Sequence, residues 1–139
     1  MPTPAAKTAA ARARQRDAAK RATLDVLLGK KPTEKEFSVT IDGAKHTLLF
    51  RALGPREYDT LLTKYPPTPE QKEAGAIFDV FSFGPAMMTK ACVDPVLTGD
   101  EWNQIWTSEA WGRGEVMDLF WGAVELTNQG LDLTPTEAG

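Results

Sequence analysis

Few side chains in this sequence could take part in catalysis. The single cysteine, Cys92, and the single histidine, His46, could form a nucleophile–base pair, because a reactive thiol needs a nearby base. No motif surrounds either residue, so we predict that Cys92 is a small buried residue and that His46 is an exposed strand residue. One Cys and one His also exclude an internal disulfide and a zinc site built from several Cys and His ligands.

Two pairs of carboxylates could perform acid–base or metal chemistry: Asp100 with Glu101, and Glu115 with Asp118. Each pair lies at the predicted start of a helix, where acidic side chains stabilise the helix dipole, so we prefer capping to catalysis. The Gly-Arg-Gly run at residues 112–114 lacks the spacing of a phosphate-binding loop and predicts a turn between helices. We therefore expect no catalytic, metal-binding or cofactor-binding residue, and a protein that is not an enzyme.

Large apolar side chains are better candidates, and they favour contact with a protein partner. All four tryptophans lie in the last third of the chain, and a domain of this size does not readily bury all of them. Aromatic side chains anchor many protein interfaces, and methionine offers an adaptable apolar surface, although a Trp pair at i and i+4 can also belong to the core. The candidate partner-binding residues are Met87, Met88, Trp102, Trp106 and Trp111.

Charge is divided unevenly along the chain, which has 139 residues and a net charge of -3. Residues 1–35 carry nine basic and three acidic side chains, a net charge of +6, whereas residues 36–139 carry seven and sixteen, a net charge of -9. The basic arm could be solvated, could grip an acidic protein surface, or could bind phosphates without sequence preference. It has no interleaved aromatic residue to stack on bases, so nucleic acid is not the partner we expect. The candidate contacts of the arm are Arg12, Arg14, Arg16, Lys20 and Arg21.

The elements that position these residues follow from the apolar pattern. Residues 5–28 are good helix formers with little apolar area, so we expect a helix that forms partly or on contact, followed by a linker at residues 30–35. Alternation predicts a β-hairpin at residues 37–41 and 45–51, joined by an Asp-Gly turn at residues 42–43. Helices are predicted to begin at Gly54-Pro55, Thr68, Gly84-Pro85, Thr98 and Glu115, while residues 78–83 are ambiguous.

These elements predict an α+β fold that is mostly α. It comprises a basic N-terminal helical arm with its linker at residues 1–35, a hairpin followed by a bundle of four or five short helices at residues 36–130, and a flexible tail at residues 131–139. The apolar runs are far shorter than the ~18 residues needed to cross a membrane, and no signal peptide is recognisable. We therefore expect a cytoplasmic protein with no membrane partner.

Several short motifs give the chain a family resemblance. They are the run from Leu53 to Leu61, the Tyr-Pro-Pro-Thr-Pro-Glu-Gln run at 65–71, the Phe-Ser-Phe-Gly-Pro-Ala run at 81–86, the Cys-Val-Asp-Pro run at 92–95, an acid-capped helix containing Trp, and a Gly-Glu step at 114–115. They follow a short β-segment with Phe37, Val39 and Ile41. Over residues 34–129 the chain resembles the tail assembly chaperones of long-tailed bacteriophages, especially those of actinobacterial hosts.

The resemblance implies a non-catalytic protein, without a cofactor, that keeps the tape-measure protein soluble while tail-tube subunits assemble around it. It also implies a location in the host cytoplasm, absence from the mature virion, and partners that could include the tail-tube protein and further copies of the chain. A longer form could arise by ribosomal frameshifting near residues 131–139. Two alternatives stay open: a structural virion connector or tail-completion protein, and a small nucleic-acid-associated protein acting through its arm.

Overall fold

The structure, a computed structural model, describes residues 20–131, 133 and 135 and divides the chain into two compact units, Met1–Lys31 and Pro32–Gly139. The division falls a few residues before the boundary predicted at residue 35. Each unit is described by itself. We call the described part of the first unit, residues 20–31, the arm, and the second unit the body.

The arm contains one short helix, α2 (Leu24–Leu28). Thr23 caps it, because the Thr23 hydroxyl accepts a hydrogen bond from Val26 N at 3.3 Å. The predicted helix over residues 5–28 is therefore wrong for residues 20–23, which precede the cap without regular structure. The remainder of that prediction, residues 5–19, lies outside the described residues.

The body begins with a β-hairpin of β1 (Glu34–Ile41) and β2 (Ala44–Arg51). Asp42 and Gly43 have φ values of 50° and 82°, the positive values that a two-residue hairpin turn of type I′ requires, so the predicted turn is confirmed. The hairpin starts earlier than predicted, because Glu34 and Lys35 continue the ladder opposite Arg51 and Phe50. Charged residues carry no alternation signal, so the sequence alone placed them in a linker.

In the described part of the chain after the hairpin there are five helices: α3 (Pro55–Lys64), α4 (Pro69–Glu73), α5 (Val80–Ala91), α6 (Gly99–Trp106) and α7 (Arg113–Asn128). The fold is α+β and mostly α, as predicted. Thr68 and Thr98 cap α4 and α6 as expected, each accepting a backbone hydrogen bond at 3.2 Å. A third strand, β3 (Cys92–Asp94), pairs with β2 to give the order β1-β2-β3. It was not predicted, because three residues directly after a helix are too few to show alternation.

Helix α5 begins earlier than its proline suggested. The predicted start at Gly84-Pro85 is wrong, because Asp79 caps the helix and Pro85 lies inside it. The Asp79 carboxylate accepts hydrogen bonds from Ser82 Oγ at 2.6 Å and from Phe81 N at 3.2 Å. Pro85 lacks the N–H that would bond to the carbonyl of Phe81.

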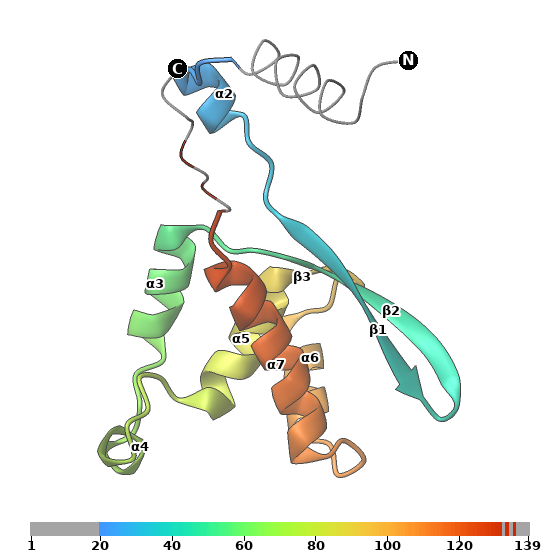
Figure 1. Cartoon of the computed structure of the whole chain (residues 1–139). Helices are drawn as coiled ribbons and strands as arrows, with labels where there is room; N and C mark the ends of the chain where they lie inside the picture. The colour runs from blue at the N-terminus through green and yellow to red at the C-terminus, as the bar shows by residue number, and fades with distance from the viewer. Residues whose placement is uncertain (1–19, 132, 134, 136–139) are drawn as a thin grey trace, which may run out of the picture. The chain divides into compact units, whose positions relative to one another are not determined.

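The core of the body lies where α5 meets α6, α7 and the sheet (Figure 1). In the figure, α7 runs between the hairpin on one side and α3 on the other. Within the described residues, no helix is both long and apolar enough to span a membrane. The largest fully buried side chains are Phe50, Phe83, Met87, Met88, Trp102 and Phe120.

Candidate partner-binding groove

Three of the five predicted partner-binding residues belong to the core. Met87 and Met88 are 0% exposed and Trp102 is 1% exposed, so the expectation that they form an exposed surface is wrong for this structure. Helix α5 is packed against α3, α6, α7 and β3, which leaves neither methionine a route to solvent. Their sulfur and methyl groups therefore fill core space.

Trp106 also has a packing role. Its indole ring lies against α5, and a Cβ added to Gly84 would be 2.6 Å from the Cε2 and Nε1 atoms of that ring. Only a glycine at this buried position allows the two helices to approach so closely. In the part of the chain that the structure describes, the buried Nε1 atoms of Trp102 and Trp106 have no hydrogen-bond partner. We therefore assign Trp106 to the α5–α6 contact, although it is only partly buried.

Trp111, in contrast to the buried Met87, Met88 and Trp102, lines an open space. This space, which we call the β1–α7 groove, has a volume of about 590 Å³ and separates the first strand from the last helix. This volume is roughly twenty times the volume that one molecule occupies in liquid water, so the groove has room for several aliphatic side chains. Its walls are residues 37–42 on β1 and its turn, Phe50 on β2, residues 110–111, and Glu115, Asp118, Leu119 and Gly122 on α7.

The apolar side of the groove comes from strand alternation. Phe37 and Val39 point to the same face of β1 and are partly buried against the core, whereas Ile41, next on that face, remains 39% exposed. The rings of Phe37 and Phe50 pack together with their centroids 4.9 Å apart. The groove therefore has an apolar floor that becomes more exposed toward the tip of the hairpin.

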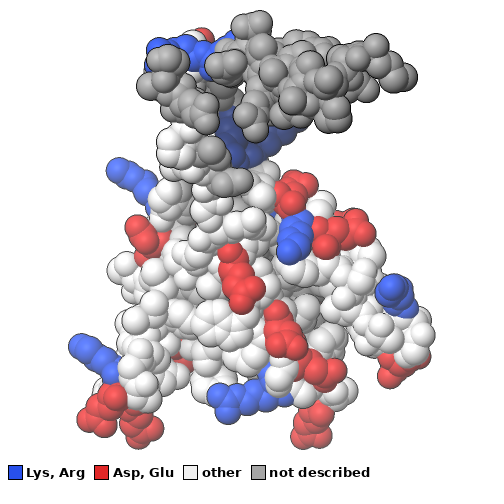
Figure 2. Space-filling view, viewed as in Figure 1, with Lys and Arg blue, Asp and Glu red and all other residues white. Residues whose placement is uncertain are grey.

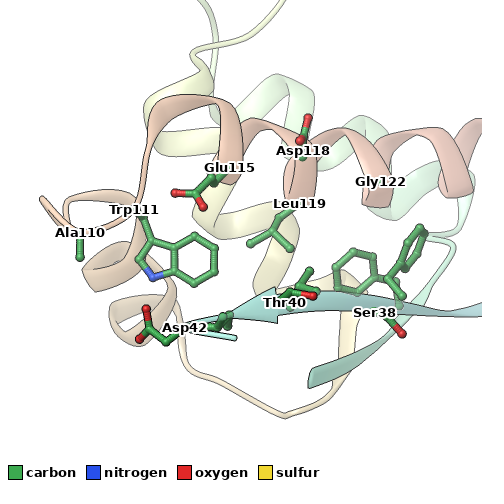
Figure 3. A pocket seen from close by; sticks show the side chains of 13 residues that line it. Ser38, Thr40, Asp42, Ala110, Trp111, Glu115, Asp118, Leu119 and Gly122 are labelled. Carbon is green, nitrogen blue, oxygen red and sulfur yellow. The ribbon is translucent and has the colours of Figure 1, made fainter. Parts of the chain in front are cut away.

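Gly122 brings α7 close to the aromatic rings at the other end. A Cβ added there would lie 3.6 Å from Phe50 and 3.7 Å from Phe37, which is ordinary van der Waals contact. Helix α7 lies closer to β2 than to β1, so the space opens between α7 and the outer strand. In Figure 3, Leu119 points from α7 toward the strand, and the indole of Trp111 lies at the end of the groove nearest Asp42.

Acidic side chains border this apolar floor. Asp42 lies at the hairpin tip, and Glu115 and Asp118 lie on α7. Glu115 caps its helix, because its Oε1 atom accepts a hydrogen bond from Gly112 N at 2.7 Å, as the sequence predicted. Asp118 makes no such cap, and among the described residues none of the three forms an ion pair. Acidic side chains are also spread over the face of the body that Figure 2 shows, so the groove favours a basic partner.

The outer edge of β1 has no neighbouring strand among the described residues. In a hairpin with a two-residue turn, the residue pair next to the turn, here Ile41 and Ala44, forms two backbone hydrogen bonds with each other. Hydrogen-bonded and non-hydrogen-bonded pairs then alternate along the two strands. The backbone groups of Ser38 and Thr40 therefore point away from β2. Polar side chains on these residues, and the charges of Glu34 and Lys35 at the start of the strand, protect the edge against pairing with another strand. The groove consequently favours a partner that docks through its side chains.

The structure does not bring the Cys92–His46 pair together. Cys92 lies opposite Phe50, and His46 is four residues further along β2, about 13 Å away at the usual strand rise. Cys92 is buried and donates a hydrogen bond to Pro95 O at 3.2 Å, and burial raises the pKa of its thiol, so the thiolate is disfavoured. His46 is exposed on the strand, as predicted.

The other predicted sites are also placed. Glu101 completes the capping box of α6 by accepting a hydrogen bond from Thr98 N at 2.9 Å, so the preference for capping is confirmed there. Within the described residues, no group of three or more His, Cys, Asp and Glu side chains could hold a metal ion. Of the predicted arm contacts, Lys20 and Arg21 are exposed just before α2, while Arg12, Arg14 and Arg16 lie outside the described residues.

Comparisons with protein-family models, curated proteins and solved structures found no match for this chain.

Sequence reasoning missed most of the groove. It treated Glu115 and Asp118 as one capping pair, whereas only Glu115 caps and Asp118 is left exposed on the groove wall. The sequence did contain one sign of the groove at Ile41. This apolar residue stands next to the hairpin turn, where few neighbours are available to bury it. The approach of α7 to the hairpin depends on contacts between residues far apart in the sequence, which alternation does not encode.

Proposed function

We propose that this protein acts by binding and not by catalysis: it is a phage tail assembly chaperone that holds a helical segment of the tape-measure protein in the β1–α7 groove. The observation that supports this proposal is the groove itself, which combines an apolar floor, a half-buried tryptophan and an acidic border. The resemblance of residues 34–129 to such chaperones supplies the identity of the partner.

The geometry suits an amphipathic helix. A helix that lies in a groove inserts the apolar side chains of one face and leaves its polar face outside. Phe37, Val39 and Leu119 would contact that apolar face, and Trp111 would cover it at one end. Lys and Arg side chains on the flanks of the partner would face Asp42 and Asp118. Such a complex would shield the apolar face of the tape-measure protein from aggregation until tube subunits replace the chaperone.

The proposed function places the protein in the host cytoplasm and not in the finished particle. The tail-tube protein, and a longer frameshifted form of the chain, are the further partners that this role involves. Mass spectrometry of purified virions separates this role from that of a virion connector. A chaperone should be missing from the particles, whereas a connector would be present in a fixed number of copies.

The groove is tested by co-expressing the full chain with the tape-measure protein of the same phage and measuring how much tape-measure protein is soluble and co-purifies. The Trp111→Ala variant should weaken the complex about tenfold, because an aromatic anchor at an interface is worth more than 1 kcal/mol. Trp121→Ala is the matched control, since Trp121 lies on α7, is 48% exposed and does not line the groove.

A charge substitution gives an independent test. Asp118→Lys should weaken the complex, whereas Asp59→Lys makes the same change of charge on an exposed position of α3, outside the groove, and should have a smaller effect. Equal effects of the two variants, or equal effects of the two tryptophan variants, would contradict binding in the groove. A wild-type chain that leaves the tape-measure protein insoluble would contradict the function itself.

A further inference from the structure

Helix α2 leaves most of its apolar surface exposed. The exposed fractions of Leu24, Val26, Leu27 and Leu28 are between 65% and 75%, and the helix buries no residue. Five residues are too few for a helix to be stable in water without tertiary contacts. The cap from Thr23 provides only one hydrogen bond. An apolar helix this short therefore needs a surface on which to dock, and the described residues of the arm, 20–31, do not supply one.

The arm and the groove have complementary chemistry. Residues 1–31 carry eight basic and two acidic side chains, whereas residues 32–139 carry eight and seventeen. Close to α2, the described basic residues include Lys20, Arg21 and Lys31, all exposed. The groove offers an apolar floor bordered by carboxylates without ion pairs in the described structure. One chain thus presents an apolar helix with a basic flank and, elsewhere, an apolar groove with an acidic border.

We propose that α2 of one copy docks in the β1–α7 groove of a second copy, and that the two copies exchange their arms symmetrically. Leu24, Leu27 and Leu28 recur at i, i+3 and i+4, so they form one stripe on the helix that faces the groove floor. A two-fold arrangement uses the same contact twice, which doubles the apolar area that becomes buried. This inference stands independently of the proposed function.

Chain length favours a second copy over the arm of the same chain. Thr33 is fixed to the sheet, because its carbonyl accepts a hydrogen bond from Ala52 N at 2.8 Å. Five chain steps separate Leu28 from Thr33 and reach at most about 18 Å when fully extended. The far end of the groove, at Ile41 and Trp111, is eight strand steps from Thr33, about 26 Å. An arm folding back on its own body would reach the near end of the groove at Phe37, four strand steps from Thr33 or about 13 Å. Even with the ~6 Å length of α2 added, it would stop short of Trp111, whereas the arm of a second copy can cover the groove up to Trp111.

Self-association of this kind would also control the access of other helices to the β1–α7 groove. A groove that holds the arm of a second copy is closed to any other helix, so a partner must displace the arm before it binds. The dimer would thereby keep its own apolar groove and apolar arm covered while no partner is present. Because self-association is measured with the purified chain alone, its outcome is separate from that of the tape-measure experiment.

The experiment is sedimentation velocity of the full chain over a range of concentrations. We expect a monomer–dimer equilibrium that shifts toward monomer in the double variant Leu27→Glu/Leu28→Glu and in Asp118→Lys, each by about tenfold or more in the dissociation constant. The control variant Val96→Glu changes an apolar residue that is 82% exposed outside the groove, and should dimerise as the wild type does. All four positions are exposed, so each variant should keep the circular dichroism of a folded body. The two variants that stay monomeric should lose only the thermal stability that dimerisation adds, and Val96→Glu should unfold as the wild type does.

Mixing the two defective variants decides the matter. The Leu27→Glu/Leu28→Glu chain keeps an intact groove, and the Asp118→Lys chain keeps an intact arm, so their mixture should recover association through one of the two contacts. A chain that is monomeric at every concentration would overturn the proposal. Dimerisation that survives Leu27→Glu/Leu28→Glu, or a mixture that associates no better than either variant alone, would overturn it as well.

Discussion

The two sides of α7 meet their neighbours in different ways. On the α5 side, Phe120 packs edge-to-face against Phe83 with ring centroids 5.6 Å apart, and both side chains are fully buried. On the β1 side, Leu119 and Gly122 border a space of about 590 Å³. One helix therefore belongs both to a closed core and to an open groove. The contrast teaches that a substitution on the closed side should change stability, whereas one on the open side should change binding.

The largest expected effect lies on the closed side. Trp102→Ala removes a side chain that is 1% exposed and should lower the free energy of unfolding by about 3–5 kcal/mol, because a cavity remains in a packed core. Urea denaturation of the purified chain measures it. The control Trp121→Ala changes a Trp that is 48% exposed and should cost far less. If both variants were equally destabilised, the division between closed and open sides would be wrong.

The second effect concerns the approach of α5 to α6. Gly84→Ala places a methyl group where Trp106 atoms lie at 2.6 Å, so the ring or the helix must shift. Overpacking of this kind costs about 1–3 kcal/mol, and the better helix propensity of alanine recovers only about 1 kcal/mol of it. We expect a net loss of stability together with a shift in tryptophan fluorescence. A more stable Gly84→Ala variant would show that the α5–α6 contact is looser than it is in the structure.

Local signals in the sequence predict much of this fold, but they stop at contacts between distant residues. The turn at Asp42-Gly43 and the caps at Thr68 and Thr98 follow from short-range chemistry, and the structure confirms them. The start of α5 was misplaced because the proline at residue 85 suggested a first-turn position, whereas the Asp79 cap lies earlier.

The candidate site was harder to predict than the elements around it. Met87 and Met88 have the composition of an adaptable surface, yet the neighbours of α5 in space bury them. Trp106 and Trp111 are alike in sequence, and only the contact with Gly84 distinguishes the packed ring from the ring that lines the groove. Residue type thus predicts which side chains can make large apolar contacts. Tertiary packing decides whether those contacts are made within the core or stay available to a partner.

On the open side, the matched substitution Gly122→Ala should raise the free energy of unfolding, whereas Gly84→Ala should lower it. Gly122→Ala adds a methyl group at 3.6 Å from Phe50, an ordinary contact, and alanine is a better helix former than glycine. We expect the free energy of unfolding to rise by about 0.5–1 kcal/mol in urea denaturation. The same methyl group narrows the groove, so binding of the docked helix should weaken. A loss of stability comparable to that of Gly84→Ala would mean that this side is as tightly packed as the other.

The smallest effect concerns the base of the hairpin, the anchored end opposite the open tip. Arg51 Nη1 and Nη2 donate hydrogen bonds to the Glu57 carboxylate at 3.0 and 2.9 Å, which ties the end of β2 to the start of α3. These hydrogen bonds hold the pKa of Glu57 below its ordinary value. Because the folded pKa is the lower one, the stabilisation is complete above the unfolded pKa and is lost as the pH falls through the folded pKa.

Both side chains are partly exposed, so solvent screening keeps the contribution below about 1 kcal/mol. Urea denaturation of the wild type and Glu57→Gln between neutral pH and about pH 3 should show a stability difference that favours the wild type and shrinks with acidification. Glu125→Gln removes an exposed carboxylate on α7 that does not bond to Arg51, and as the matched control it should cost less stability at neutral pH than Glu57→Gln. A difference between the wild type and Glu57→Gln that stays constant or widens at low pH would show that this end of the hairpin is held by packing alone.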